Sequence, residues 1–448
     1  MAALLAVCVL AVGFATYRAV DLLHRVSGFT NPLQEAQNAF DPPRGSIAWK
    51  LKNDQRVNLL LLGYGGAEND APYLTDSMVV ASLDPANKRV MLVSVPRDLS
   101  VQIDAFQNQA PMRNKINVAY SAGIQDDVYH GKKPQFTGGK DRGGLLAEQT
   151  VSSISGLQFD GYIAVDFKAF RDVVDNLGGV NVCLDGPLDD YQYPNYHNGY
   201  VKGGIHFKAG CQPVNGEQAL ELARSRHAEQ AAQATDFGRA RRQQLILNAI
   251  RRKATSVGAI TRAPGLMSAL AQDFSTNLSL TDMKSLYDWG GKLPDTSIGR
   301  VPITNQDFLN ESCSTGIYYL CPEDPSTKVL RTYFADLFVD PRALAEKAPV
   351  QIDNGSRSLS DLGNRVSRTL QPLGLQVDPT QRVQPAQQTV IYDYSDGKYP
   401  KTVQWLETYF GATVQQVPAG ARPPTPNPPG GGVVVVLGHD YAVRWIGQ

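Results

Sequence analysis

The sequence predicts an α/β protein, in which a layered sheet–helix domain with a mixed central sheet is followed by a small C-terminal α/β domain and preceded by one N-terminal transmembrane helix. From about residue 57, strand-like apolar runs alternate with amphipathic helical segments, a pattern typical of layered α/β domains. The alternation restarts at about residue 349, and an uncharged apolar run stands at the N-terminus. We therefore expect a transmembrane anchor at 1–17, a stalk at 18–55, the first α/β domain at 56–345, and the C-terminal domain at 346–448 with a Pro/Gly-rich loop at 418–432.

The N-terminal run, MAALLAVCVLAVGFATY, contains no charged residue. Its length lies at the short limit for a membrane span, which is about 17 apolar residues. It has no basic n-region and no convincing A-x-A cleavage site, so an uncleaved anchor is favoured, with a cleaved signal peptide as the alternative. We expect a single-pass membrane protein with the bulk of the chain outside the cytoplasm.

Charge and cysteine content narrow the classes of function. The formal net charge is zero, so no overall electrostatic field indicates a nucleic-acid partner. Four cysteines follow the apolar run, none in C-x-x-C spacing, which argues against a zinc ribbon or a thioredoxin-type motif. An even number of cysteines outside the cytoplasm fits two disulfides. Of the three possible connectivities we choose the local one, Cys183–Cys211 and Cys313–Cys321.

Residues 57–98 form the first predicted element, a set of three strand-like apolar runs. Asp84-Pro85-Ala86-Asn87 is a turn signal between the second and third runs, which predicts a hairpin. Asp76 opens the second run and Arg97-Asp98 close the third, so the hairpin should bring Asp76 beside Arg97 at one rim of the sheet. A carboxylate beside an arginine suits a metal ion and a phosphate, but equally a surface ion pair that caps a sheet.

The next elements complete the alternation of strands and helices. After the segment Lys115–Tyr120 and a polar, glycine-rich loop at 121–141, we expect a helix at 143–155, a strand at 161–166, a helix at 167–176 and a strand at 180–184. The loop at 185–206 is rich in aspartate and tyrosine. Its rings suit stacking on sugars, while a surface loop tethered by the Cys183–Cys211 bridge is the alternative.

A basic stretch follows at 215–253. Between residues 224 and 253 there are eight Lys or Arg and two acidic residues. Arg224 and Arg226 stand at the exit of a predicted helix at 217–225, and Asp236 is a good N-cap for a second helix.

The start of that second helix predicts phosphate binding. Arg239, Arg242 and Gln243 have i, i+3, i+4 spacing and share one face of its first two turns. Arginines at a helix N-terminus oppose the macrodipole unless an anion neutralises them, and both helix N-termini and arginine forks bind phosphate. A solvated basic face and a nucleic-acid patch are the alternatives, and the second is improbable outside the cytoplasm.

Several motifs in order resemble the LytR–CpsA–Psr family over residues 57–253. They are T-D-S-M, S-V-P-R-D, K-I-N-V-A-Y, D-G-Y-I-A-V-D-F with N-L-G-G-V-N-V, and A-R-S-R with D-F-G-R-A-R-R-Q-Q. The resemblance implies a membrane-anchored, extracytoplasmic enzyme that binds a polyprenyl-(pyro)phosphate-linked glycopolymer. With Mg²⁺, such an enzyme transfers the glycopolymer to peptidoglycan. The pattern from about 349 also resembles the C-terminal domain often attached to this family, with a central strand at 433–437.

The resemblance also implies roles for individual residues. Asp76 would hold the magnesium ion, and Arg97 would contact the phosphate or its bridging oxygen. Asp98 and Lys115 match motif positions, Asp98 as a catalytic residue and Lys115 in phosphate binding. Apart from the resemblance, the acceptor hydroxyl needs a general base, for which Asp98 and Asp236 are candidates; an N-cap role explains Asp236 equally well. The pyrophosphate would be clamped by Arg224, Arg226, Arg239 and Arg242, with help from Gln243.

Two positions depart from the family pattern. Many members carry an aspartate just after the first strand and an arginine shortly before T-D, where this chain has Tyr64 and Leu74. Glu68, Asn69 or Asp70 are the candidates to replace the carboxylate. The missing aspartate and arginine favour a second hypothesis, a carrier-lipid sensor or a scaffold for wall assembly without turnover. A polyprenyl pyrophosphatase, in which water replaces the acceptor, is a third. The chain has no G-x-S-x-G, H-E-x-x-H or Walker A motif, which argues against those other chemistries.

Overall fold

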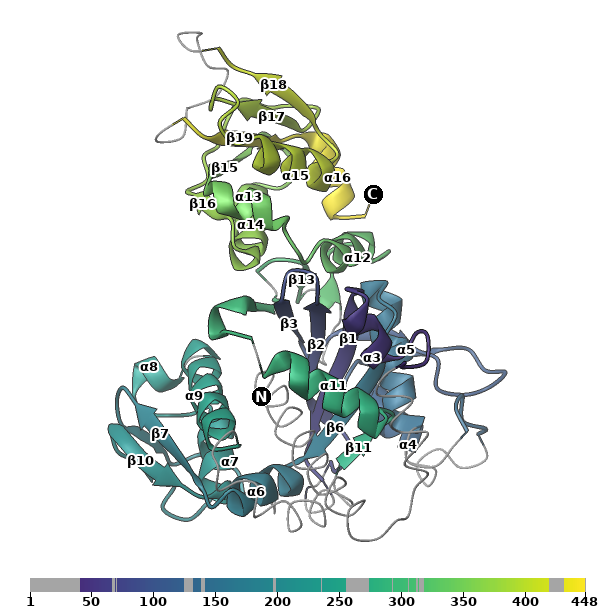
Figure 1. Ribbon diagram of the computed structural model, residues 1–448, viewed down its shortest axis with the longest axis vertical. Helices are drawn as coiled ribbons and strands as arrows, with labels where there is room; N and C mark the ends of the chain where they lie inside the picture. The colour runs from purple at the N-terminus through teal and green to yellow at the C-terminus, as the bar shows by residue number, and fades with distance from the viewer. Residues whose placement is uncertain are drawn as a thin grey trace. The chain divides into compact units, whose positions relative to one another are not determined.

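In the computed structural model the chain forms two compact units. Figure 1 shows the ribbon coloured by residue number. The first unit comprises residues up to 97, 102–150 and 158–297, and the second comprises 98–101, 151–157 and the residues from 298 on. The structure describes residues 41–447 apart from 67–68, 70, 125–131, 138–141, 196–198, 235, 255–273, 292, 305, 312, 314–317 and 419–430.

A mixed sheet forms the centre of the first unit, as the sequence predicts. Its strands within the first unit lie in the order β11-β6-β1-β2-β3, and they belong to a six-stranded sheet. β1 runs antiparallel to β2 and parallel to β6. Every residue of β1 is buried, which agrees with its uninterrupted apolar sequence. The bounds are β1 Val57–Tyr64, β2 Thr75–Asp84, β3 Arg89–Val95, β6 Gly161–Asp166 and β11 Phe274–Thr276.

The strand register brings four chain segments to one end of this sheet. Tyr64, the last residue of β1, pairs with Thr75 at the start of β2 and with Asp166 at the end of β6. Val95, the last residue of β3, pairs with Met78 of β2. We call this end, where β1, β3 and β6 finish and β2 begins, the Tyr64 end of the sheet.

Helix α6 leaves the sheet at the Tyr64 end. It follows β6 without a loop, because Asp166 is both the last residue of the strand and the N-cap of the helix. The Asp166 carboxylate accepts a hydrogen bond from the Ala169 N–H at 2.7 Å, a regular N-cap contact. The helices of this unit are α3 Ile47–Lys52, α4 Val118–Ile124, α5 Arg142–Ser155, α6 Phe167–Asn176, α7 Gly216–Arg224, α8 Ala231–Ala234, α9 Asp236–Ala254 and α11 Leu280–Gly290; the end of α5 belongs to the second unit.

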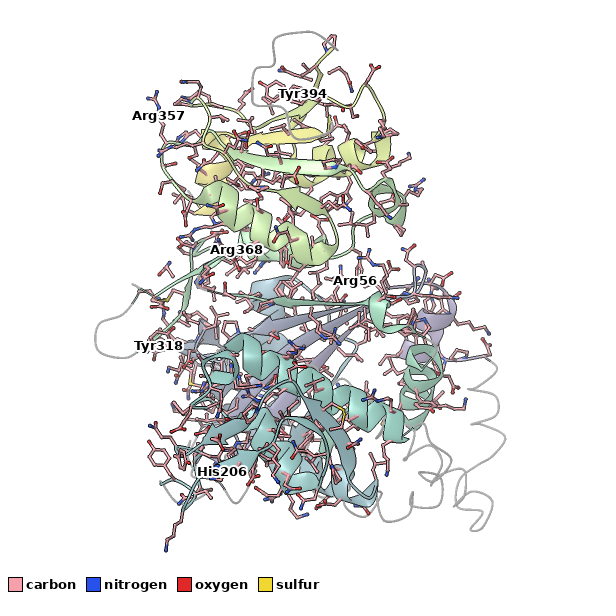
Figure 2. All side chains as sticks on the ribbon, turned by 90° about the vertical axis from the view of Figure 1, so that its left-hand side faces the viewer. Arg56, His206, Tyr318, Arg357, Arg368 and Tyr394 are labelled. Atoms are coloured by element: carbon pink, nitrogen blue, oxygen red, sulfur yellow. A yellow bond between two sulfur atoms is a disulfide. The ribbon has the colours of Figure 1, made fainter. Side chains whose placement is uncertain are left out.

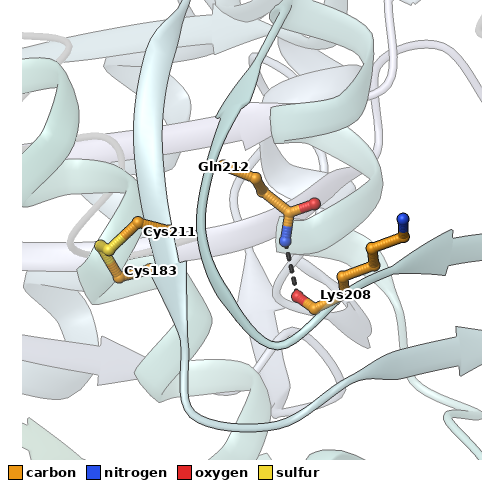
Figure 3. Close-up of a disulfide and its surroundings, with 4 residues drawn as sticks. All are labelled: Cys183, Lys208, Cys211 and Gln212. Atoms are coloured by element: carbon orange, nitrogen blue, oxygen red, sulfur yellow. Dashed lines mark hydrogen bonds between the residues drawn. A yellow bond between two sulfur atoms is a disulfide. The ribbon is translucent and has the colours of Figure 1, made fainter.

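Three two-stranded sheets complete the first unit. β7 (Val180–Leu184) and β10 (Gly210–Val214) pair with Cys183 opposite Cys211, and these two cysteines form a disulfide (Figure 3). Gln212 beside this bridge donates a hydrogen bond to the Lys208 carbonyl at 2.6 Å. The other pairs are β4 (Ser100–Ile103) with β5 (Met112–Lys115) and β8 (Leu188–Asp190) with β9 (Ile205–Phe207); the first two residues of β4 belong to the second unit.

The second unit contains a five-stranded sheet in the order β16-β15-β19-β17-β18. β19 is central and buried at every residue, as its unbroken run of valines predicts. β17 is antiparallel to β19, and the other pairs are parallel. The strands from residue 298 on, including those outside this sheet, are β12 Ile298–Pro302, β13 Leu309–Asn310, β14 Cys321–Pro322, β15 Pro349–Asn354, β16 Gln376–Asp378, β17 Val390–Asp393, β18 Thr413–Gln416 and β19 Val433–Leu437. The helices are α12 Lys328–Ala335, α13 Pro341–Glu346, α14 Leu362–Leu370, α15 Pro400–Phe410 and α16 His439–Trp445.

The continuous part of this unit starts at residue 298, and the expected domain boundary at 345/346 stays a prediction. The unit contains contacts between residues far apart in sequence. Arg368, labelled in Figure 2, donates to Asp307 at 2.8 Å, and the Phe308 and Trp445 rings stack with centroids 5.2 Å apart. Such contacts have no local sequence signal, so the pattern of strands and helices alone does not predict them.

The second disulfide, Cys313–Cys321, lies in this unit, so the structure contains both local cysteine pairs that we expected. No helix within the described residues, which start at 41, has both the length and the apolar character to cross a membrane. The predicted anchor at 1–17, most of the stalk and most of the loop at 418–432 lie outside the described residues.

Candidate phosphate-binding site

Asp76 and Arg97 form an ion pair at the Tyr64 end of the sheet. Arg97 Nη1 donates to Asp76 Oδ1 at 2.5 Å, as the hairpin prediction requires. Both side chains are 39% exposed. An ion pair this exposed contributes at most about 1 kcal/mol to folding. The fold therefore depends little on the pair, and both groups can exchange their partner for a ligand.

Tyr64 fills the family's first aspartate position with a buried ring. Its centroid lies 5.1 Å from that of Tyr120 and 6.2 Å from that of Tyr73. Burial, followed by the charges of Tyr120 and Asp166, raises the Tyr64 pKa well above its usual value. Burial also raises the pKa of Tyr120 to about 12. Both phenols are neutral at pH 7, so Tyr64 does not replace a carboxylate.

The structure describes only some of the residues near the two positions that depart from the family pattern. Asn69 donates to the Gly65 carbonyl at 2.6 Å, and Leu74 is half-buried. Glu68 and Asp70 lie outside the described residues.

Asp166 is a carboxylate at this end of the sheet that sequence reasoning did not single out. It is 6% exposed and pairs with Tyr64 in the strand register. Gly66, at φ +83°, packs against it, because a Cβ atom on Gly66 would lie 2.9 Å from Asp166 Oδ2. The available signal was an aspartate directly between a strand and a helix, which indicates an N-cap.

Arg224 comes to the Tyr64 end from the last position of α7. Its guanidinium lies over the Phe167 ring at 4.4 Å and over the Tyr193 ring at 5.5 Å, both within cation–π range. Phe167 directly follows Asp166, the last residue of β6. Since β6 and β2 are separated by two strand spacings, roughly 10 Å, the structure brings Arg224 to the end of the sheet that holds Asp76 and Arg97.

Arg242 and Gln243 lie where the prediction did not place them. The Arg242 side chain is 1% exposed and donates to the carbonyls of Leu222 at 2.9 Å and Ser225 at 2.7 Å. Its Nη1 donates to the Gln233 carbonyl at 2.7 Å. Gln243 donates to the carbonyl of Ala223, the residue before Arg224, at 3.0 Å. These side chains donate to carbonyl groups that the C-terminus of α7 leaves without helical partners. Arg242 therefore stabilises the end of the helix that carries Arg224.

Arg239 and Arg226 are more accessible than Arg242. Arg239 is half-buried, and Arg226 is exposed. Burial, and then the charge of Arg239, lower the Arg242 pKa to about 10. Arg239 therefore lies within electrostatic range of the α7 terminus, and the two helices concentrate positive charge there.

The remaining predicted site residues are only partly located. Lys115 ends β5, where its N–H donates to the Asn114 side chain at 2.8 Å. Asp98 belongs to the second unit, and its carbonyl accepts a hydrogen bond from the Leu320 N–H at 3.0 Å. Asp236 begins α9 as predicted, but its side chain lies outside the described residues.

Asp76 is a carboxylate that could hold a metal ion together with a bound phosphate and water. Within the described part of the chain, no group of three or more His, Cys, Asp or Glu residues could hold a metal. Magnesium is commonly bound by one or two carboxylates, substrate phosphates and water. The donor set therefore fits Mg²⁺ that arrives with, or joins, a bound phosphate.

The structure defines an α/β protein with a cluster of charged and aromatic side chains at the end of its sheet. Residues 25–334 match the model of the LytR_cpsA_psr family, and the chain belongs to that family. Residues 347–441 match a second model, described as LytR cell envelope-related transcriptional attenuator.

Characterised relatives carry transferase names. The chain is 29% identical over 257 residues, 57% of its length, to the polyisoprenyl-teichoic acid–peptidoglycan teichoic acid transferase TagV of Bacillus subtilis. It is 31% identical over 249 residues, 55% of its length, to the enzyme of the same description, TagU, of Oceanobacillus iheyensis. These matches span 58% and 67% of the two relatives. The crystal structure of B. subtilis TagV aligns over 63% of this chain and 97% of TagV, with 27% identity and a TM-score of 0.44.

Proposed function

We propose that this protein is a membrane-anchored, extracytoplasmic phosphotransferase that moves a glycopolymer from a polyprenyl-pyrophosphate carrier to peptidoglycan with Mg²⁺. The observation that carries the proposal is the grouping of Asp76, Arg97 and Arg224 at the Tyr64 end of the sheet. The transferase names of the relatives support the class of reaction. The two disulfides support the compartment, because disulfides persist in oxidising surroundings.

In the proposed complex, the arginines bind the two phosphates of the carrier. Arg97 exchanges its exposed partner Asp76 for a phosphate oxygen, and Arg224, Arg226 and Arg239 hold the remaining oxygens. Guanidinium groups suit this role because they donate paired hydrogen bonds to phosphate and keep their charge. Lys115 is a further phosphate-binding candidate.

The transfer itself exchanges one P–O bond for another. The acceptor hydroxyl oxygen of peptidoglycan attacks the phosphorus that bears the glycopolymer. The bond from that phosphorus to the bridging oxygen breaks, and polyprenyl phosphate leaves with the electron pair. The hydroxyl proton passes to a base, for which Asp98 and Asp236 are the candidates. Arg97 stabilises the charge that develops on the leaving phosphate.

In this proposal, Asp76 would hold the magnesium ion. When bound with the pyrophosphate, the ion would neutralise charge on the phosphate oxygens. Asp76 would then be released from Arg97, so each member of the ion pair would take a partner of opposite charge.

A binding protein without turnover, a carrier-lipid sensor or a scaffold for wall assembly, is the second candidate. It is favoured by Tyr64, whose buried neutral ring stands where many family members carry a carboxylate. A polyprenyl pyrophosphatase, in which water replaces the acceptor hydroxyl, is the third.

One assay separates the three. The full chain is incubated with a polyprenyl-pyrophosphate-linked oligosaccharide, peptidoglycan fragments and Mg²⁺, with and without chelator. We expect magnesium-dependent coupling of sugar to peptidoglycan, reduced at least about a hundredfold in Asp76→Ala, since loss of the metal removes charge stabilisation. Release of polyprenyl phosphate without coupling would favour the pyrophosphatase. Carrier binding with no product, in both conditions, would favour the sensor or scaffold.

A further inference from the structure

The segment that joins α7 to α8 carries two of the proposed phosphate ligands, Arg224 and Arg226. Helix α7 ends at Arg224, and Ser225 has extended backbone angles, φ −50° and ψ 132°. Arg226 is exposed, whereas Ser225 between the two arginines is 0% exposed. Something must hold this short extended segment, because neither a helix nor a strand fixes it.

The buried carboxylate of Asp190 accepts several hydrogen bonds that hold this segment. Asp190 is the last residue of β8 and is 0% exposed. Its Oδ2 accepts hydrogen bonds from Ser225 Oγ at 2.7 Å and from the N–H groups of Arg226 and His227, each at 3.2 Å. Its Oδ1 accepts the Gln192 N–H at 3.0 Å.

Ser225 is therefore held from two sides. Asp190 accepts its hydroxyl and the N–H of the next residue, while Arg242 Nη2 donates to its carbonyl at 2.7 Å. The buried contacts all involve Ser225 and the backbone, which leaves the guanidinium of Arg226 at the surface.

The neighbouring residue, Asp189, faces a different partner. Its carboxylate accepts from His206 Nδ1 at 2.7 Å and from Gln230 Nε2 at 2.6 Å. His206, labelled in Figure 2, also directs Nε2 at the Gly203 carbonyl at 2.8 Å. Two acceptors call for two N–H groups, which agrees with a His206 pKa raised chiefly by its hydrogen bond to Asp189. Asp189 thus holds Gln230, at the α8 end of the same segment, whereas Asp190 holds the α7 end that carries the two arginines.

We propose that Asp190, acting through Ser225, is a positioning residue that holds Arg224 and Arg226 ready for the carrier pyrophosphate. The inference rests on the proposed function, since it assumes that these arginines bind the phosphates. A segment that is fixed before the ligand arrives loses less conformational entropy on binding. Removing the Asp190 carboxylate should therefore weaken affinity even when both arginines are present.

The test compares Asp190→Asn and Ser225→Ala with the matched control Asp189→Asn, all in the full chain. Binding of inorganic pyrophosphate is measured by calorimetry, and thermal unfolding is followed in parallel. We expect affinity to fall about tenfold in Asp190→Asn and about threefold in Ser225→Ala, because a buried charged acceptor or its donor is lost. We expect Asp189→Asn to bind within about twofold of the unchanged chain, because its pair with His206 is exposed and its contacts lie at the α8 end of the segment.

A double-mutant cycle separates positioning from a general structural role. In an Arg224→Ala/Arg226→Ala background, Asp190→Asn should weaken pyrophosphate binding no further, because the groups that it positions are absent. Equal weakening in both backgrounds, or unchanged affinity of Asp190→Asn in the intact background, would overturn the proposal. If Asp190→Asn does not fold, Ser225→Ala takes its place in the cycle. Failure of the unchanged chain to bind pyrophosphate would instead overturn the proposed function, and this inference with it.

Discussion

Two regions of the first unit each contain an arginine that the sequence predicted to bind phosphate, and the structure treats them differently. At the Tyr64 end, Arg97 is 39% exposed and pairs with one exposed carboxylate. At the junction of α7 and α9, Arg242 is 1% exposed and donates to three backbone carbonyls. The difference teaches that the partner of an arginine, and not its place in a basic motif, separates a ligand-binding role from a supporting one.

The largest effect expected from this comparison is on turnover at Arg97. Arg97→Ala should lower the rate of glycopolymer transfer about a thousandfold, as expected for a group that stabilises developing charge. Its free energy of unfolding should change by about 1 kcal/mol or less, because the ion pair is exposed. Rates come from the coupling assay and stability from urea denaturation. A large loss of stability with intact turnover would return Arg97 to a structural ion pair.

The converse is expected at Arg242. Arg242→Ala leaves the carbonyls of Leu222, Ser225 and Gln233 without their donor, and we expect the free energy of unfolding to fall by about 3 kcal/mol. The matched control is Arg241→Ala on the same helix, whose side chain is exposed and paired with exposed Asp185. That control should stay within about 1 kcal/mol of the unchanged chain. Equal stabilities for the two variants would end the distinction between buried and exposed arginines.

The contrast between buried and exposed ionisable side chains also applies to carboxyl groups, and Glu148 on α5 is the example. Its Oε1 is buried and has no hydrogen-bond partner in the described part of the chain, and burial raises its pKa from 4.5 to about 7. Between these values the folded chain binds more protons than the unfolded chain. Stability from this group is therefore present below pH 4.5 and is lost as the pH rises through 7.

We expect stability to fall by about 2 kcal/mol between pH 5 and pH 7 on account of Glu148. Glu148→Gln should flatten the profile in urea denaturation. Some slope should remain, since burial and then Glu217 raise the pKa of Glu221 to about 7 in the same direction. An unchanged slope in Glu148→Gln would show that the buried carboxyl is not the source.

Local sequence patterns predicted the elements of the fold and part of the site. The apolar runs, the turn at Asp84–Asn87 and the motif at the start of β2 were enough to place Asp76 beside Arg97. A hairpin brings the start of its first strand beside the end of its second strand. Likewise, a run of valines was enough to place β19 in the middle of its sheet.

Other features depended on contacts between distant segments. Spacing put Arg239, Arg242 and Gln243 on one face of a helix, but it could not show that the C-terminus of α7 would cover part of that face. Asp190 was visible only as one acidic residue in a polar loop, since its role depends on Ser225, 35 positions later. The pair of Arg368 with Asp307 depends in the same way on residues far apart in sequence.

The placement of β11 has a consequence for the order in which the chain can fold. β11 covers the edge of β6, pairing Phe274 with Val165, yet it lies more than a hundred residues downstream. During synthesis the β6 edge, with its apolar sequence GYIAVD, stays open until residue 276 has emerged. An uncovered apolar strand edge invites pairing with other chains. The β6 edge is therefore open to such pairing while the residues of α6 to α9 emerge, and it is covered only when β11 arrives.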